Sequence, residues 1–280
     1  ENAMIEQWSA VRKESNYLNS VLSDLLKEQR ADIEKFTKDK ELQKEYTQRV
    51  FPELLESLRR DTTCGVFLVM ANDQPIGAPG DFTGFFLRDS DPVTKVDTNS
   101  DLLLERGDKT LARQWGITLD NSWSPAFRFQ GKGIRESDDF FYEPYTAGMA
   151  HTGVDMASLG YWSMPFILED YEMDNHKMIT YSVPLVNDGV IYGVVGTEVS
   201  VSYLCNTYFR VQDLNRQQTA GYAIAVDNGD GTYENIAGKG NLYDAVQREN
   251  GIFKLESTKH EDLFKVKDSK IGSQEIYALF

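Results

Sequence analysis

The chain has 280 residues, 41% of them hydrophobic, which is enough to build one large domain or two smaller ones with real cores. Its 44 acidic and 29 basic residues give a formal net charge of −15. This charge argues against binding of nucleic acid or of an anionic membrane face, because both need clustered Lys and Arg. No apolar run of about 18 residues is present, so no transmembrane segment is expected within the sequence, and no signal peptide is visible.

The N-terminal region, residues 1–60, is predicted to be a helical stalk. Residues 4–36 contain no Gly or Pro, and their apolar side chains recur at spacings of three, four or seven, which predicts one long helix. Its apolar stripe could pack on its own domain or pair with a second copy as a coiled coil. A second helical segment, 40–60, contains Pro52, which indicates a kink or a new helix start.

A first sheet is expected to begin after this stalk. Residues 66–71 are typical of a buried strand, and residues 82–87 of its return strand after a turn rich in Gly and Pro. Residues 88–140 are weakly patterned, with a short helical piece near 108–115. A long aromatic-rich insertion between sheet elements is unusual without a function. A helix is predicted over 138–150.

The clearest local signal is a hairpin formed by residues 178–186 and 190–201. Asp188-Gly189 lies between these two β-rich segments, and Gly accepts the positive φ that a tight turn needs. The second segment is almost entirely apolar, which predicts a central strand. Glu198 is the lone acid in it.

A second, smaller sheet is predicted for residues 213–280. Residues 221–226 and 232–237 have the pattern of two strands around a Gly-rich turn, and further strands are expected near 252–256, 263–267 and 274–280, with a short helix near 241–248. Whether this domain is complete stays open. Cys64 and Cys205 are expected to be unpaired thiols, because two cysteines do not define a disulfide framework.

The residues around the hairpin resemble those of a known family. Trp162-Ser163-Met164-Pro165-Phe166, then Thr180–Leu185, Asp188-Gly189 and Gly193–Ser200 occur in the order and spacing of the double-Cache, or tandem PAS-like, extracellular sensor domains of bacterial receptors. The resemblance covers residues 140–205 well.

This resemblance implies an α/β (α+β) fold in which a long N-terminal helix is followed by two PAS-like domains with central antiparallel sheets. Residues 61–212 would form the membrane-distal ligand-binding domain and residues 213–280 the membrane-proximal one. It also implies an extracellular or periplasmic part of a cell-membrane protein, whose spans lie outside this sequence. A histidine kinase, a diguanylate cyclase and a chemoreceptor are all compatible outputs.

The sequence offers little sign of catalysis, metal binding or a cofactor. The three His residues stand in no nucleophile motif, and no Gly-x-Ser-x-Gly elbow is present. His151 with Asp155 is the nearest metal candidate, and a surface pair explains it better. The 227–231 segment lacks the ligands of a calcium loop. No enzyme activity, metal or cofactor is therefore predicted for this chain.

Small-molecule binding is the remaining prediction, because aromatic rings with a few polar groups suit a ligand pocket. Glu198 is one candidate residue, since a buried carboxylate needs a cation, several donors or water. In amino-acid-binding members of the family an acid at this place receives the ligand's ammonium group. The other candidates are the aromatic residues Trp115, Trp123, Phe141, Tyr142, Tyr145, Tyr161 and Trp162.

The sequence also departs from the family pattern. Amino-acid-binding members carry an Arg on the helix before the hairpin, whereas residues 140–145 contain none; Arg128 or Arg135 could substitute from the insertion. Phe166 stands where Tyr is usual. An amine, an amino acid, a purine-like ring or a sugar-like molecule all stay open as ligands.

Two alternatives of other classes stay open as well. One is a secreted carbohydrate-active enzyme that uses acids such as Asp138, Asp139 or Glu198. The other is an interaction module that forms a homodimer through residues 4–36 and binds no small ligand.

Overall fold

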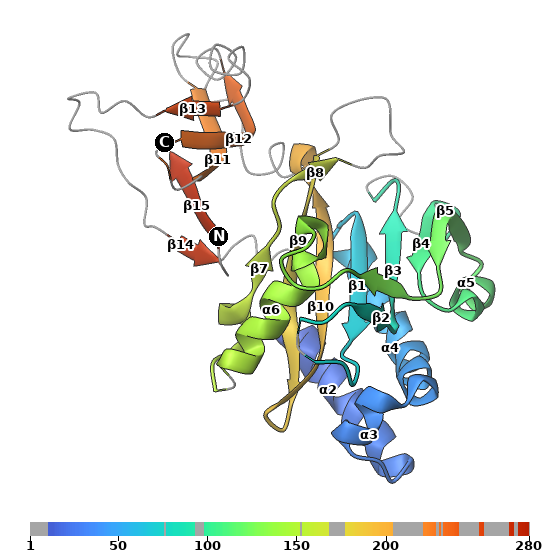
Figure 1. Ribbon diagram of the computed structural model, residues 1–280. Helices are drawn as coiled ribbons and strands as arrows, with labels where there is room; N and C mark the ends of the chain where they lie inside the picture. Colours follow the sequence, from blue (N-terminus) through green and yellow to red (C-terminus); the bar gives the residue numbers. More distant parts are fainter. Residues whose placement is uncertain are drawn as a thin grey trace. The chain divides into compact units, whose positions relative to one another are not determined.

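A computed structural model of the chain describes residues 11–75, 77–92, 98–151, 153–167, 177–203, 221–227, 230, 232–240, 252–254, 269–271 and 274–279 (Figure 1). Two compact units are present, one formed by 1–164 with 180–199 and the other by 165–179 with 200–280. The boundaries expected near residues 60 and 212 stay predictions.

Three helices open the first unit: α2 (Val11–Glu28), α3 (Ile33–Lys38) and α4 (Lys40–Arg60). The prediction of one helix over 4–36 is therefore wrong beyond Glu28, and residues 4–10 lie outside the described residues. Arg30 adopts a left-handed φ of 48°, which ends α2. Asp32 then caps α3 by accepting a hydrogen bond from the Lys35 amide at 2.8 Å.

The apolar stripe of α2 packs on the chain's own domain. Leu18, Leu22 and Leu25 are fully buried. The Tyr46 hydroxyl of α4 donates to the Leu18 carbonyl at 3.1 Å, which ties the two helices together. Of the two uses predicted for this stripe, packing within the chain is the one observed among the described residues, while a homodimer stays a prediction.

The main sheet has the strand order β5-β4-β3-β1-β10-β9-β7. All of its printed pairings are antiparallel except that of β4 with β5. The mixed α/β fold with a large antiparallel sheet is thus confirmed. The strands are β1 (Gly65–Met70), β3 (Gly84–Asp89), β4 (Leu102–Arg106), β5 (Thr118–Ser124), β7 (Tyr161–Trp162), β9 (Lys177–Asn187) and β10 (Val190–Ser200).

The predicted hairpin is confirmed as β9 and β10. Asp188 and Gly189 have φ values of 49° and 78°, so both turn residues adopt the positive φ of a type I′ turn. Residues 191–199 of β10 are all buried, as expected for a central strand covered on both faces.

Helices cover one face of this sheet. Phe51 of α4 packs on Phe85 of β3, with ring centroids 4.9 Å apart, and the hydroxyls of Tyr46 and Tyr192 lie 3.2 Å apart. We call this side the helical face. In Figure 1 α2 and α4 lie behind the sheet.

The opposite face, which we call the α6 face, is covered by helix α6 (Asp139–Ala150) and by a ribbon of β2 (Gly80–Phe82) and β6 (Phe127–Phe129). The helix predicted over 138–150 is therefore confirmed. The insertion also contains α5 (Lys109–Trp115) and the short 3-10 helix η1 (Glu136–Asp138), and η2 (Met156–Leu159) follows α6. An aromatic cluster fills the space under α6: Phe67, Val69, Phe82, Phe127, Phe129, Phe141, Tyr142 and Val194.

The second unit contains its own antiparallel sheet of order β13-β12-β11-β15-β14. Its strands are β11 (Gly221–Asp227), β12 (Thr232–Gly240), β13 (Ile252–Lys254), β14 (Ser269–Ile271) and β15 (Gln274–Leu279), and β8 (Phe166–Ile167) pairs with the start of β9. The elements expected at 241–248 and 263–267, and Cys205, lie outside the described residues. Within the described part of the chain, no helix is both long and apolar enough to cross a membrane.

Candidate functional site

The aromatic residues predicted to bind a ligand do not gather in one place. Trp115 lies on the helical face, where its ring centroid is 6.0 Å from that of Phe51. Trp123 lies on β5, and its indole Nε1 donates to the Gly107 carbonyl at 3.1 Å. These two residues are therefore separated from the aromatic residues of α6.

The three aromatic candidates of α6 belong to the aromatic cluster. The Phe141 ring stacks on that of Phe129 at 4.9 Å and on that of Tyr145 at 5.3 Å. Tyr142 is buried, and its hydroxyl donates to the Ala78 carbonyl at 2.8 Å. These contacts have the form of a packed core, in which the rings fill space and their polar atoms are satisfied by the chain.

Tyr161 and Trp162 form the short strand β7, paired with Ser182 and Tyr181 of β9. The Trp162 ring lies 4.8 Å from that of Tyr181. Burial raises the pKa of the Tyr161 hydroxyl, and the negative charges of Asp139, Glu143 and Glu136 raise it further. Tyr161 therefore stays a neutral hydrogen-bonding group.

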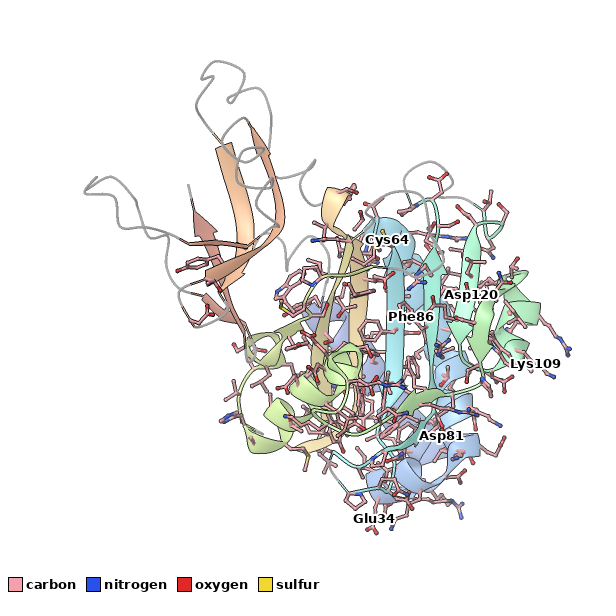
Figure 2. The ribbon with its side chains drawn as sticks, turned by 45° about the horizontal axis from the view of Figure 1, so that its top comes forward. Glu34, Cys64, Asp81, Phe86, Lys109 and Asp120 are labelled. Carbon is pink, nitrogen blue, oxygen red and sulfur yellow. The ribbon has the colours of Figure 1, made fainter. Side chains whose placement is uncertain are left out.

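Glu198 is fully buried and bound by an arginine that the sequence did not single out. Its carboxylate accepts two hydrogen bonds from Arg88 of β3, from Nε at 3.0 Å and from Nη2 at 3.1 Å. Nη1 of Arg88 donates to Glu105 of β4. The Arg88 guanidinium also lies over the Phe86 ring, 5.2 Å from its centroid, and Figure 2 labels Phe86 on the sheet. We call Glu198, Arg88 and Glu105 the ionic network.

Gly65 makes this network possible. In the sheet register Gly65 of β1 lies directly between Glu198 of β10 and Arg88 of β3. Residues in one such row share a face, so the Arg88 side chain must pass over Gly65 to reach Glu198. A Cβ at Gly65 would lie 2.8 Å from the Phe86 ring and 3.1 Å from Glu198 Cβ. Only a residue without a side chain leaves this path open.

The ionic network holds more negative than positive charge. It contains two carboxylates and one guanidinium. The Glu198 side chain is 0% exposed, and those of Glu105 and Arg88 are each 12% exposed. Burial raises the pKa of Glu105; the Arg88 charge opposes this change, and the Glu198 charge adds to it. The arrangement thus favours a further cation or hydrogen-bond donor.

One hydroxyl group on the same face lacks a partner. Ser182 donates to the Phe140 carbonyl of α6 at 2.7 Å, which places the Ser182 side chain on the α6 face. Thr180, two residues along β9, lies on that face as well. It is 4% exposed, and its Oγ1 forms no hydrogen bond within the described part of the chain. A buried hydroxyl without a partner costs about 1–3 kcal/mol.

The sequence reasoning missed Arg88, Gly65 and Thr180. A signal for Arg88 was present, since it is a cation that directly follows the apolar run Phe85-Phe86-Leu87 in its strand. The suggested substitutes lie elsewhere: Arg128 is 77% exposed and lies 3.6 Å from Asp81, and Arg135 is also exposed.

Comparison with known proteins shows that this chain is similar to solved structures of sensory domains. No protein-family model matches this sequence, and no curated protein sequence matches it. Among solved structures, the chain is similar to the periplasmic sensory domain of the Campylobacter jejuni chemoreceptor Tlp1, with 12% identity, a TM-score of 0.40, and coverage of 99% of this chain and 94% of that one.

Two further solved structures belong to the same class. The ligand-binding domain of the Pseudomonas aeruginosa amino acid chemoreceptor PctC, in complex with GABA, has 13% identity and a TM-score of 0.33 over 83% of this chain and 87% of that one. The extracellular domain of mmHK1S-Z3, described as a histidine kinase, has 13% identity and a TM-score of 0.37 over 81% of this chain, which spans only 61% of that one. This is the class that the sequence resembles, while the function proposed below rests on the chain's own residues.

Proposed function

We propose that this chain is an extracytoplasmic ligand-sensing domain of a bacterial signal-transduction receptor. Its first unit binds a small molecule on the α6 face and passes the change toward the membrane. The single observation that carries this proposal is the buried ionic network, with its excess negative charge and the unpartnered Thr180 hydroxyl on the same face. Structural networks are normally satisfied within the chain, whereas a binding site leaves polar groups for its ligand.

The network favours an amine among the predicted ligand classes. Arg88 already donates through Nε, Nη1 and Nη2 to the two carboxylates, so it has little left to offer a ligand carboxylate. The excess negative charge would attract an ammonium group. Phe86 and Tyr161 supply aromatic surface on this face. Glu198 would then act on the ligand through the charge of the network rather than as a lone receptor of the ammonium group.

The packing of the sheet against α2 and α4 supports transmission of ligand binding to these helices. The strands that carry Glu198 and Arg88 have their other side on α2 and α4, through contacts such as Phe51 with Phe85. A ligand that binds more tightly to one arrangement of the strands would favour the matching position of the helices.

The decisive experiment compares two buried threonines. Thr180→Val removes the hydroxyl on the α6 face. Thr197→Val is the matched control, because Thr197 Oγ1 is also buried and forms no hydrogen bond with the described residues. Thr197 directly precedes Glu198 in β10, so its side chain lies on the opposite face of the sheet. Both variants should have unchanged or higher melting temperatures, since each removes an unsatisfied polar atom.

Ligand binding should separate the two variants. A thermal-shift screen of amines, amino acids, purines and sugars identifies a ligand, which at 100 times its dissociation constant adds about 2.7 kcal/mol. Thr180→Val should weaken binding about tenfold, and Thr197→Val should leave it unchanged. Equal effects of the two variants would refute the site. Consumption of the bound compound would instead favour the enzyme alternative.

A further inference from the structure

A cavity in the first unit has the opposite charge character to the ionic network. Its volume is about 420 Å³, within the range of small-molecule sites. It is bounded by α4, α5, the β2–β3 connection and the segment after β5. Figure 2 labels two of its lining residues, Lys109 on α5 and Asp81 on β2.

Three lysines line this cavity in a chain whose net charge is −15. Lys40 and Lys44 are four residues apart on α4, so they lie on one side of the helix, and Lys109 begins α5. Lys44 forms an ion pair with Glu41 at 2.8 Å. Lys40 and Lys109 form no ion pair in the described part of the chain. Two ammonium groups are thus available to a ligand.

The two acids that line the cavity are already engaged. Asp81 lies 3.6 Å from Arg128. Asp108 caps α5 by accepting a hydrogen bond from the Thr110 amide at 2.9 Å. Burial alone would raise the pKa of Asp108, but the hydrogen bonds from Thr110 and the charges of Lys44 and Lys109 lower it. Asp108 thus offsets part of the Lys109 charge, but within the described residues neither acid forms an ion pair with Lys40 or Lys109.

The cavity wall also has an apolar part, beside the polar residues Thr47, Gln48 and Thr83. Phe82, Leu111 and Trp123 contribute side chains to it. The Trp123 ring is held in place because its Nε1 donates to the Gly107 carbonyl. A rigid indole beside two available ammonium groups suits a ligand with a flat apolar body and one negative charge, since the ring face packs on the indole and the anion pairs with the lysines.

From these features we propose that this cavity, which we call the lysine pocket, binds a small organic anion with an apolar body, such as an arylalkyl carboxylate. The lysine pocket shares no residue with the ionic network, and its proposed ligand is of the opposite charge. It does not depend on the sensory function proposed above. A ligand there would contact α4, α5 and β2 together.

Three probes with one shape and different charges test this proposal. Phenylacetate is anionic, phenylacetamide is neutral and 2-phenylethylamine is cationic. Calorimetric titration of the full chain should show phenylacetate binding at least tenfold more tightly than phenylacetamide. Any binding of 2-phenylethylamine should not depend on Lys40 and Lys109, because an ammonium group is repelled by the lysine pocket. Phenylacetate binding should change the tryptophan fluorescence, and Trp123→Phe should reduce that change.

Substitution of the lining lysines tests whether phenylacetate binds in the lysine pocket. Lys40→Gln combined with Lys109→Gln should weaken phenylacetate binding at least tenfold without lowering the melting temperature, because both side chains are exposed. Lys27→Gln is the matched control, since Lys27 is 78% exposed on α2 and does not line the cavity. Equal binding of phenylacetate and phenylacetamide, or phenylacetate binding that is insensitive to Lys40 and Lys109, would overturn the proposal. Loss of phenylacetate binding in Thr180→Val, with the lysine variants unaffected, would place the anion on the α6 face and overturn it too.

Discussion

Asp89 at the end of β3 provides the sharpest test of the electrostatics of the first unit. It is 5% exposed, as is Asp101, whose two carboxylate oxygens form no hydrogen bond within the described residues. Burial raises the pKa of Asp89 from its ordinary value of 3.8 to about 6, and the charges of Asp101 and Asp91 contribute. A hydrogen bond from the Asp91 amide, at 2.8 Å, opposes the change.

The sign and size of the effect on stability follow from this pKa. The folded state holds the Asp89 proton up to about pH 6, whereas the unfolded state releases it near pH 4. The folded state therefore binds more protons between these values, and the free energy of unfolding falls as the pH rises through this window. A difference of about two pH units corresponds to a loss of up to about 3 kcal/mol above pH 6.

Asp89→Asn should remove this loss. Asn is neutral at every pH, and its side-chain oxygen can still accept from the Asp91 amide. Urea unfolding followed by circular dichroism should show the variant about 2–3 kcal/mol more stable than the parent chain at pH 7.5 and nearly equal to it at pH 4.

The control for Asp89 is Asp188→Asn, which makes the same chemical change in an exposed turn. Asp188 has φ 49°, a conformation that Asn accepts readily. Its side chain is exposed, so the substitution should change the free energy of unfolding by less than about 0.5 kcal/mol. A stability gain of Asp89→Asn that is equal at pH 4 and pH 7.5, or a loss at pH 7.5, would refute the reasoning.

Three further predictions concern packing around the sheet. Gly65→Ala should destabilise the chain by about 1–3 kcal/mol in urea unfolding, because its Cβ meets the Phe86 ring at 2.8 Å; a neutral result would mean that Phe86 moves aside without cost. Arg88→Met should lower the unfolding free energy by about 3–5 kcal/mol by leaving Glu198 buried without its cation, and adding Glu198→Met should recover most of the loss, whereas additive losses would contradict this account. Tyr46→Phe should cost about 1 kcal/mol, since it removes the buried hydroxyl pair with Tyr192, and an unchanged thermal midpoint would count against that pair.

Elements defined by neighbouring residues were predictable from the sequence. The hairpin follows from Asp188-Gly189, because both residues must adopt positive φ in a two-residue turn. Helix α4 and helix α6 lie where the apolar pattern indicated. The break at Arg30 was not predictable in this way, because the spacing of apolar residues continues across it and Phe36 is buried through the separate helix α3.

The candidate site was predictable only in part. Glu198 stood out as an acid in an apolar strand. Of the partners expected for it, namely a cation, several donors or water, the structure shows a cation. Its partner Arg88 is 110 residues away in the chain, and only the strand order brings the two together. The aromatic set illustrates the same limit: Trp115 and Trp123 lie in a weakly patterned insertion, where no periodicity indicates which face or edge each residue occupies.

The path of Arg88 over Gly65 also has a mechanical consequence. Arg88 lies on β3 and Glu198 on β10, so their ion pair links these two strands across the central strand β1. Sliding β3 or β10 by one dipeptide, about 7 Å, would pull the charges apart, and the same slide of β1 would replace Gly65 by a residue with a side chain under Arg88. Shear between the three strands is thus blocked in the first unit. A twist or a tilt of the three strands together would keep the ion pair intact, so the ion pair opposes sliding of the strands more than it opposes these motions.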